Sequence, residues 1–365
     1  MTIRSRGFTL VAALGALLVL GPACGGKRKD AAWPVAFAEA ERAQTAGRFA
    51  EAAERYDAAA KRAPNARERA HAEYLAGKMM ASAGNVSDAS ARFEQIANAS
   101  PSGEHSARAL YDLGALRIDN GNAAGWADLE RVALTWPREG IANRALQRAC
   151  AHKDEQDKRA TIAWLASIAP RVKDTELEES VEYQQANRLH ALGDLDAAHA
   201  KFVSITERFP YPHGRTWDDS LFHASEIDEA KSNYAEAVLH LETMLKEREV
   251  SSLMGSYQRP RFTPALIRIA TLYRDRLHDN DHARKAFHRL YADFTTSTMR
   301  DDALWQEARL WRADGDASEA CSRLSTLVSD FPDSRYVPCA IAQCSGVTRP
   351  GKSKAPKTCH PYLER

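Results

Sequence analysis

The feature that most constrains the fold of this chain is a repeat of roughly 37 residues. One marker of the repeat is glycine, spaced 37 residues apart at Gly47, Gly84 and Gly121. A second marker is proline, spaced by 37 and 36 residues at Pro64, Pro101 and Pro137. Because two independent markers share one period, the chain is predicted to be a series of similar units, each stacked on the next.

Each turn glycine is followed by a small and a large apolar residue at fixed distances. In five units a Gly, or a Ser in its place, precedes an Ala by five positions and a larger apolar residue by nine: Gly47, Ala52, Tyr56; Gly84, Ala89, Phe93; Gly193, Ala198, Phe202; Ser232, Ala237, Leu241; and Gly315, Ala320, Leu324. Gly121 is the exception, with Trp126 and Glu130 at these places. Residues four apart share one helical face, where the Ala lets a neighbouring helix approach and the larger side chain fills the gap.

The same markers predict where the helices end. Glycine supplies the residue with positive φ that ends one helix and lets the next fold back. Proline then stops the second helix of a unit, at Pro64, Pro101, Pro137, Pro170, Pro210 and Pro332. The sequence therefore predicts an all-α chain of helix-turn-helix units.

The order of the Gly, Ala, aromatic and Pro markers resembles that of tetratricopeptide repeats over residues 34–345. The resemblance implies a solenoid of about eight tetratricopeptide-like helix pairs, in which the first helices line a concave groove. The expected units are 34–64, 65–101, 102–137, 138–170, 177–210, 216–250, 262–295 and 299–332. The fourth lacks a turn glycine, and in the seventh Asp279 and Asn280 are expected to replace it while Ala283 and Phe287 keep the helical spacing. Residues 247–262 form an insertion, either a loop on the binding face or a long connection.

The N-terminus carries a predicted export signal over residues 1–23. Arg4 and Arg6 precede a 13-residue apolar run, which suits a signal peptide and is too short to span a bilayer as a helix. The run ends in Gly21-Pro22-Ala23-Cys24, which resembles the lipobox of bacterial lipoproteins and implies a lipidated Cys24, with residues 24–33 as a linker. Gly25 stands where an Asp would imply retention in the inner membrane, so the resemblance implies the periplasmic face of the outer membrane. Ordinary signal cleavage, which leaves a soluble periplasmic or secreted protein with Cys24 as a free thiol, is the alternative.

Three aromatic-rich segments resemble the repeats of bacterial envelope proteins more narrowly: Trp136-Pro137, Phe209-Pro210 and residues 331–336. Similar repeats occur in the lipoprotein of the outer-membrane β-barrel assembly machinery and in Tol-associated periplasmic proteins. The resemblance implies partners among other envelope proteins or their extended peptide segments.

A series of aromatic residues lies ten positions before the turn markers, at Phe37, Tyr74, Tyr111, Tyr183, Phe222 and Trp305. One turn later come Glu41, Lys78, Ala115, Asn187, Glu226 and Arg309. Rings beside polar groups suit the capture of an extended peptide or of a partner's helix. The candidate groove residues are therefore Tyr74, Lys78, Tyr111, Tyr183, Asn187, Phe222, Trp305 and Arg309. The alternative is that these rings only pack between neighbouring units.

Charge and motifs argue against several other functions. The 365 residues carry a formal net charge of +1, so there is no global basic field to recruit nucleic acid. The sequence contains no G-x-S-x-G elbow, no phosphate-binding loop, no H-E-x-x-H and no paired C-x-x-C. His278 and His282 flank the expected turn of the seventh unit, which favours a solvated turn over a metal site. No catalytic residue, cofactor or metal is predicted.

Five cysteines besides Cys24 bear on the compartment. Cys321, Cys339, Cys344 and Cys359 could form two disulfides in an oxidising periplasm, for example Cys321 with Cys339 and Cys344 with Cys359, and three connectivities are open. Reduced thiols packed between helices are the alternative, and this is the expectation for Cys150. The basic segment 346–365 is predicted to be a poorly ordered tail unless a bridge through Cys359 holds it.

These observations favour a non-enzymatic protein-binding scaffold of the bacterial envelope. The alternative is a cell-wall glycan binder, or an auxiliary subunit of a cell-wall enzyme, in which the same rings stack on sugars. A hydrolase on a helical frame is the third hypothesis, and no recognisable catalytic frame supports it.

Overall fold

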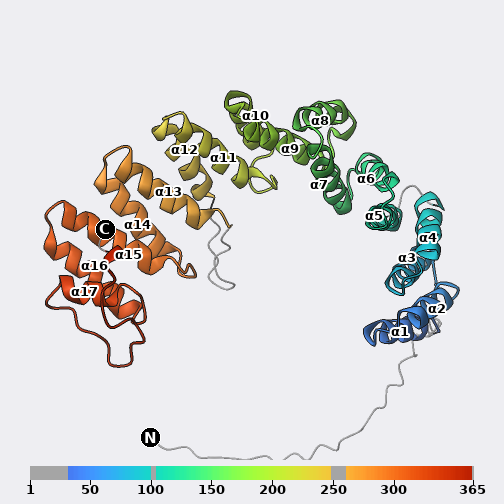
Figure 1. The fold of residues 1–365 in the computed structure, drawn as a ribbon, viewed down its shortest axis with the longest axis horizontal. Coiled ribbons are helices and arrows are strands. Elements are labelled where there is room, and N and C mark those ends of the chain that lie inside the picture. The colour runs from blue at the N-terminus through green and yellow to red at the C-terminus, as the bar shows by residue number, and fades with distance from the viewer. Residues whose placement is uncertain (1–31, 100–103, 248–259, 364–365) are drawn as a thin grey trace, which may run out of the picture. The chain divides into compact units, whose positions relative to one another are not determined.

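A computed structural model describes residues 32–99, 104–247 and 260–363 of the chain. In these ranges the regular elements are seventeen α-helices and one short 3-10 helix, without a strand, so the predicted all-α class is confirmed (Figure 1). The chain divides into two compact units, the first ending at Ile96 and the second starting at Ala97, and each is described by itself. The predicted signal peptide, Cys24 and most of the insertion lie outside the described residues.

The helices form eight consecutive pairs, which confirms the predicted repeat. Unit 1 contains α1 (Ala32–Thr45), α2 (Phe49–Ala60), α3 (Ala66–Ser82) and nearly all of α4 (Val86–Ala99). Unit 2 contains α5 (Glu104–Asp119), α6 (Ala124–Thr135), α7 (Gly140–Asp154), α8 (Lys158–Val172), α9 (Glu178–Ala191), α10 (Leu195–Arg208), α11 (Trp217–Ala230), α12 (Tyr234–Lys246), α13 (Phe262–Asp275), α14 (Asn280–Asp293), α15 (Arg300–Ala313), α16 (Ala317–Asp330), α17 (Val337–Gln343) and the 3-10 helix Pro361–Leu363. Within each unit, every helix packs mainly on the helices before and after it. No helix of the described ranges has both the length and the apolar character needed to cross a bilayer.

The turns inside the pairs use the residues that the sequence marks. The five turn glycines all have positive φ, between 72° and 86°: Gly47, Gly84, Gly121, Gly193 and Gly315. Ser232 takes the same conformation with φ 64°. In the seventh pair the expectation was wrong by one residue, because His278 adopts positive φ (54°) in place of Asp279 or Asn280. Asp279 is needed as the N-cap of α14, where its carboxylate accepts a hydrogen bond from the backbone N–H of His282 at 3.0 Å.

The prediction that Pro170 ends a helix was also wrong. α8 continues to Val172 and contains Pro170 in its last turn. The missing N–H of Pro170 removes one hydrogen bond to the carbonyl of Ala166. Both residues are exposed, so water can satisfy that carbonyl and the helix continues for two more residues.

The paired small and large residues form the cores of the helix pairs. Both members of the five predicted sets are buried, as are Ala283 and Phe287 of the seventh pair. In the third pair the register is shifted by one residue, so that Gly125 and Leu129 are buried in place of Trp126 and Glu130. A Cβ atom on Gly125 would lie 2.3 Å from the carbonyl oxygen of Gly114, so α5 and α6 approach each other backbone to backbone there.

Two disulfides close the C-terminal end of unit 2. Cys321 of α16 pairs with Cys344, and Cys339 of α17 pairs with Cys359. All four candidate cysteines are therefore paired, but not in the connectivity given above as an example. That example fails because helix α17 places Cys339 beside the returning tail and Cys344 beside α16. Cys150 is buried as a free thiol, and burial raises its pKa to about 11.

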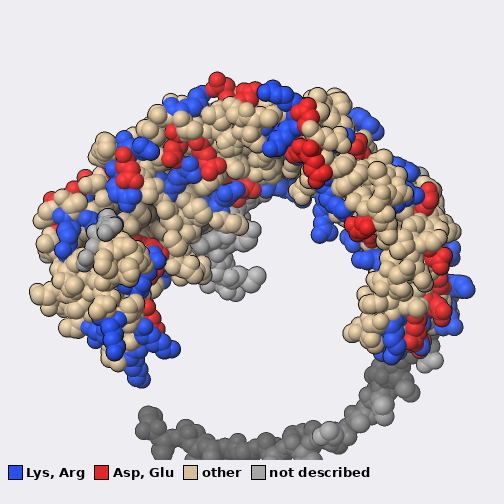
Figure 2. All heavy atoms as spheres, viewed as in Figure 1, with Lys and Arg blue, Asp and Glu red and all other residues tan. Residues whose placement is uncertain are grey.

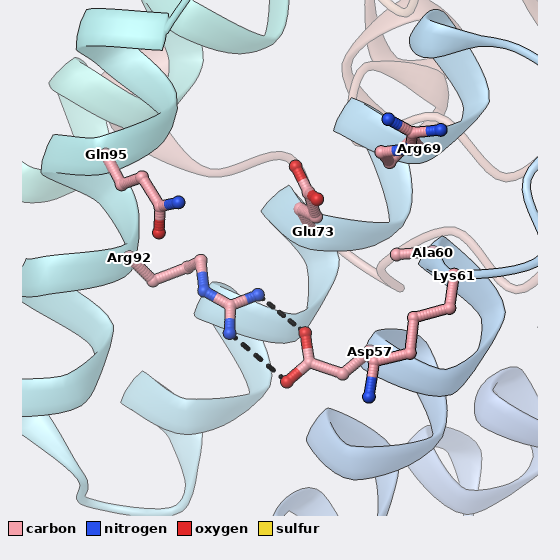
Figure 3. A pocket seen from close by; sticks show the side chains of 7 residues that line it. All are labelled: Asp57, Ala60, Lys61, Arg69, Glu73, Arg92 and Gln95. Atoms are coloured by element: carbon pink, nitrogen blue, oxygen red, sulfur yellow. Dashed lines mark hydrogen bonds and ion pairs between the residues drawn. The ribbon is translucent and has the colours of Figure 1, made fainter.

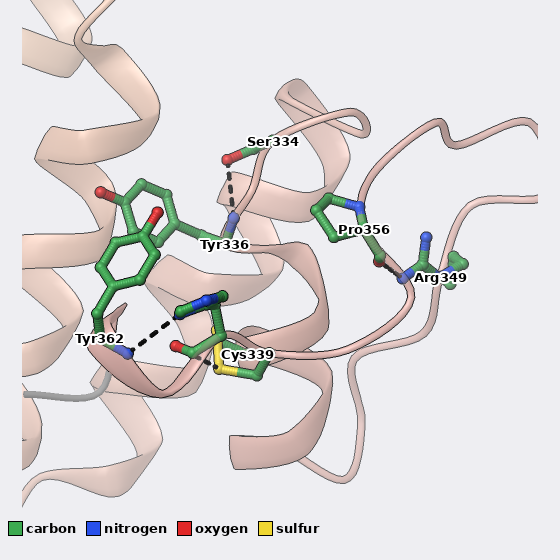
Figure 4. The surroundings of a disulfide bond; sticks show 8 residues. Ser334, Tyr336, Cys339, Arg349, Pro356 and Tyr362 are labelled. Carbon is green, nitrogen blue, oxygen red and sulfur yellow. Dashed lines mark hydrogen bonds between the residues drawn. A yellow bond between two sulfur atoms is a disulfide. The ribbon is translucent and has the colours of Figure 1, made fainter.

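The basic tail was predicted to be poorly ordered unless a bridge through Cys359 holds it. That bridge is present, and the described residues up to 363 pack against the last helices. Val347, Ala355 and Leu363 are buried in one cluster with residues of α15, α16 and α17. Arg349 also donates hydrogen bonds to the carbonyl oxygens of Ala355, at 3.0 Å, and of Pro356 (Figure 4). The order follows from the Cys359 bridge, because a chain tied down 20 residues after Cys339 returns its apolar side chains to the helices.

Candidate functional site

A pocket of about 250 Å³ lies in unit 2, where residues of α13, α14, α15 and the segment before α17 line one cavity. From α13 it is lined by Ile267, Thr271 and Arg274. These residues follow the i, i+4, i+7 spacing of one helical face. Leu266 and Ile269 lie on another face of α13 and are buried in the core, so the face with Ile267, Thr271 and Arg274 lines the pocket.

The eighth pair supplies the opposite wall. Met299, Asp302, Ala303 and Gln306 line the pocket from the start and the first two turns of α15. Buried Phe287 and Leu290 of α14 contribute to its apolar floor. Met299 is 37% exposed, an unusual exposure for a large apolar side chain, and it leaves apolar surface open at the rim.

Charged and hydroxyl groups complete the rim beside α17. Arg335 donates hydrogen bonds to Asp302 Oδ1 at 2.5 Å and to the Tyr336 hydroxyl at 2.8 Å. The Tyr336 hydroxyl in turn donates to Asp302 Oδ1 at 2.5 Å. Burial first, and then this bond to Asp302, raise the pKa of Tyr336. The phenol therefore stays a donor, and it holds the carboxylate and the guanidinium in place.

Arg274 is held in place from the other side of the pocket. Its Nη1 donates to Gln306 Oε1 at 3.1 Å, and its Nε and Nη2 donate to the two oxygens of Asp275 at 2.7 and 2.9 Å. The pocket thus combines an apolar floor with polar groups that are already positioned. Such a site can bury an apolar side chain of a bound segment while guanidinium and amide groups contact its backbone.

Three of the aromatic residues predicted for the groove are buried. Trp305 is only 1% exposed, and Tyr74 and Phe222 are also buried. The guanidinium groups of Arg261 and Arg268 lie over the Phe222 ring, 4.7 and 5.5 Å from its centroid. These three rings pack within and between helix pairs, which is the alternative to a binding role that the sequence left open. Little ring surface is left for a partner at Phe222, which Arg261 and Arg268 of the following pair cover, or at Trp305, which Tyr336 covers from the segment before α17.

The other predicted groove residues keep some exposure. Tyr111 and Tyr183 are half-buried, and Asn187 forms a side-chain hydrogen bond with Tyr183. Lys78 is exposed, with its Nζ 5.9 Å from the Tyr74 ring centroid. Arg309 is half-buried on α15. These residues do not share one pocket, and their role in binding remains a prediction.

The pocket residues Ile267, Thr271, Gln306 and Arg335 were missed from the sequence. The aromatic series is interrupted at the seventh unit, where Arg268 takes the place of a ring, so α13 gave no signal. The residues of α15 could have been predicted more easily. Asp302 and Gln306 are four residues apart and therefore share a helical face beside that of Trp305. Arg335 lies outside any predicted pair, and only the fold brings it to Asp302.

A second pocket, of about 520 Å³, lies within unit 1 between α2, α3 and α4 (Figure 3). Arg92 of α4 points across it to Asp57 of α2 and forms two hydrogen bonds of 2.5 and 3.2 Å. Lys61, Arg69 and Glu73 complete its charged lining. Lys61 and Arg69 are exposed, so water solvates these charges and they do not require a ligand.

Surface charge does not point to a polyelectrolyte partner. Lys and Arg are interspersed with Asp and Glu over the visible face of each unit (Figure 2). Of the two histidines weighed above as a metal site, His282 is bound to the cap residue of α14, with its Nδ1 2.7 Å from Asp279 Oδ2.

Comparison with known families supports the repeat type. The tetratricopeptide repeat model matches residues 302–334, which span the eighth pair from α15 to the turn after α16. Repeats of this type are generally protein-interaction scaffolds, and the match indicates no enzyme family. No curated protein sequence matches the chain.

Several solved structures are similar to the chain in fold. The C-terminal part of a TPR repeat-containing protein from Cytophaga hutchinsonii is 14% identical, with a TM-score of 0.45, over 73% of this chain and 99% of that one. The apo form of RapI is 11% identical, with a TM-score of 0.45, over 83% and 90% of the two chains. PilF of Pseudomonas aeruginosa is 13% identical, with a TM-score of 0.37, over 65% and 98%. Similarity at this level does not indicate a function.

Proposed function

We propose that this chain is a non-enzymatic protein-binding scaffold of the bacterial cell envelope. The observation that carries the proposal is the pocket between α13 and α15, with its apolar floor and positioned arginines. The occupant is an extended segment of another envelope protein that inserts one apolar side chain. Because the helices and the arginines are already ordered, little conformational entropy is lost on the scaffold's side when the segment binds.

The envelope location rests on two features. The N-terminal segment resembles a lipoprotein signal that would anchor the chain through Cys24 at the periplasmic face of the outer membrane, in the manner of assembly-type envelope lipoproteins. The pairing of four cysteines in two disulfides supports an oxidising compartment. A multiply acylated Cys24 would hold the membrane far more firmly than a single acyl chain.

In-cell photo-crosslinking tests the proposed groove. A photoreactive amino acid is placed at Met299, on the rim of the pocket, and as a matched control at Leu239, an exposed apolar residue of the second helix α12. We expect discrete protein adducts at Met299 that are absent at Leu239 and that decrease when Gln306→Ala is added. Adducts of equal yield at both positions, or none at Met299 in a folded and exported chain, would contradict the proposal.

Glycan binding is the alternative outcome. Sugar recognition would favour exposed rings, and burial of Tyr74, Phe222 and Trp305 removes three of the candidates. Sedimentation with purified cell wall separates the two functions, because a protein scaffold stays in the supernatant and a glycan binder pellets with the wall.

A further inference from the structure

Three side chains with metal-ligand chemistry meet in unit 2, at the junction of the fifth and sixth helix pairs. They are His199 of α10, Asp228 of α11 and His240 of α12, and their ligand atoms all lie within 4.8 Å of one another. His199 Nε2 lies 3.0 Å from Asp228 Oδ2, and His240 Nε2 lies 3.3 Å from the same oxygen. Two imidazoles therefore face one carboxylate oxygen.

The fold creates this arrangement from residues that are far apart in the sequence. α10 packs on α11, and α11 packs on α12, so one face from each helix meets at the junction. The Asp228 side chain is only 5% exposed. Its second oxygen, Oδ1, lies 3.5 Å from Asn233 Nδ2, at the N-cap of α12. Asp228 is thus held from two sides, as the carboxylate ligand of a metal is usually held by its surroundings.

The distances suit a small transition-metal ion. Zn²⁺ binds imidazole nitrogen and carboxylate oxygen at about 2.0–2.2 Å, so neighbouring ligand atoms of a tetrahedral site are about 3.3 Å apart. The two His–Asp distances, 3.0 and 3.3 Å, are close to this value. The two imidazoles are no more than 4.8 Å apart at their ligand atoms, so a modest side-chain rotation brings them to the same spacing.

The charges around the three ligands are negative on balance, because the carboxylates of Asp196, Asp228 and Glu236 outnumber the single ammonium group of Lys231. Asp196 lies one turn before His199 on α10 and pairs with Lys231, and Glu236 lies one turn before His240 on α12. Because Lys231 is paired with Asp196, its positive charge does not repel an ion that approaches Asp228. His199 is 28% exposed and is the side from which an ion and a further ligand can enter.

We propose that His199, Asp228 and His240 form a binding site for a divalent transition-metal ion, with Zn²⁺ as the reference ion. The metal takes the place of the protons that the two imidazole Nε2 atoms direct at Asp228, and each neutral imidazole then carries its proton on Nδ1. Three protein ligands leave one tetrahedral position for water or for a donor from a bound partner. Since the ligands come from three successive helices, the bound ion also fastens the fifth pair to the sixth. Ca²⁺ and Mg²⁺ prefer all-oxygen sites and are not expected to bind.

Isothermal titration with Zn²⁺ tests the site on the purified, chelator-treated full chain. We expect one Zn²⁺ equivalent to be lost, or its affinity to fall at least about 10–100-fold, in His199→Gln and in His240→Gln. His282→Gln is the matched control, because His282 also lies beside an aspartate, Asp279, but without a second imidazole, and it should bind as the unchanged chain does. Mg²⁺ serves as the negative ion.

Cobalt provides a readout that does not depend on the stability of a variant. Co²⁺ bound by two imidazoles and a carboxylate in a four-coordinate site is expected to give intense visible absorption bands, which Zn²⁺ then removes by displacement. His199→Gln, at a partly exposed position, should keep its helical circular dichroism and lose these bands. If the unchanged chain binds neither ion, or if the histidine variants bind both ions as well as the control, the proposal is wrong.

Discussion

The indole ring of Trp305 stacks on the phenol ring of Tyr336, with ring centroids 4.9 Å apart and the planes inclined by 15°. The contact joins α15 to the segment that leads into α17, and it lies directly behind the pocket rim formed by Arg335 and Asp302. Tyr336 therefore has two roles, since its ring covers Trp305 and its hydroxyl positions Asp302. Trp305 does not line the pocket and supports it from behind, whereas Tyr336 is one of the lining residues.

Replacing Trp305 by Ala should affect stability and binding together. Truncation of a fully buried Trp leaves a large cavity, and we expect the free energy of unfolding to fall by about 3–5 kcal/mol. The matched variant is Gln306→Ala, one residue further, which should lower the adduct yield of a Met299 probe while the melting temperature barely changes. Thermal unfolding and crosslinking of both variants measure this. A Trp305→Ala chain that melts normally would show that the ring is not part of the core.

Two glycines with equally open surroundings should respond in opposite ways to alanine. A Cβ atom meets nothing within 4 Å at Gly193 or at Gly140, but only Gly193 has positive φ, at 78°. Gly193→Ala should therefore destabilise the chain by about 1–2 kcal/mol through backbone strain alone. Gly140→Ala, in the first turn of α7, should be neutral or stabilise by up to about 1 kcal/mol. Chemical denaturation of both variants tests the difference, and equal effects would contradict the role of the turn.

Loss of the second disulfide should release the tail. The Cys339–Cys359 bridge closes a separation of 20 residues, so removing it in Cys339→Ser/Cys359→Ser should cost about 3 kcal/mol. Trypsin should then cut faster at Lys352 and Lys354, because both lysines are exposed and the bridge no longer restrains their backbone. The Cys321→Ser/Cys344→Ser variant removes a bridge of similar separation, 23 residues, and keeps Cys359 attached. Equal cleavage in both double variants would show that the tail does not depend on its own bridge.

The Glu226 carboxylate should stabilise the folded chain only at pH values at which it is ionised. Hydrogen bonding from His223, at 2.8 Å, and the nearby Arg268 hold the pKa of Glu226 below 4.5. A lowered pKa in the folded state contributes stability above pH 4.5, and this contribution disappears as pH falls through the folded-state pKa. Glu226→Gln should thus be less stable by up to about 1 kcal/mol at pH 7, and as stable as the unchanged chain in acid.

Urea unfolding at pH 7, 5 and 3 measures this dependence on Glu226. Glu207→Gln, which removes an exposed carboxylate of α10, is the control and should follow the unchanged chain at every pH. A difference between Glu226→Gln and the unchanged chain that persists undiminished at pH 3 would exclude the titration of Glu226 as its cause.

Local chemistry explains which parts of the fold could be predicted. Glycine at a positive-φ turn, and Ala followed four residues later by a large side chain, act within one helix pair, so Gly193, Ala198 and Phe202 already identify such a pair. The errors occurred where two local demands competed. Asp279 is a good turn residue and also a good N-cap, and the cap interaction moved the turn to His278.

The exposure of the predicted groove residues was harder to predict. The place of a side chain on its helix does not determine which neighbouring side chains pack over it. Trp305 and Tyr183 occupy the same place in their repeats, yet one is fully buried and the other is half-buried. The difference comes from the next element along the chain: Tyr336 stacks on Trp305, whereas Tyr183 meets the smaller ring of His223, 6.3 Å away at the centroids.

The sequence by itself determined the helix pairs, their number and most of their turns, because these depend on backbone preferences and on helical periodicity over a few residues. Only the tertiary structure decided which side chains face each other across pairs. It joined Cys339 to Cys359, Arg335 to Asp302, and His199 and His240 to Asp228. Such contacts depend on the packing angle and register of successive helices, which the summed packing of many side chains determines and no short motif encodes.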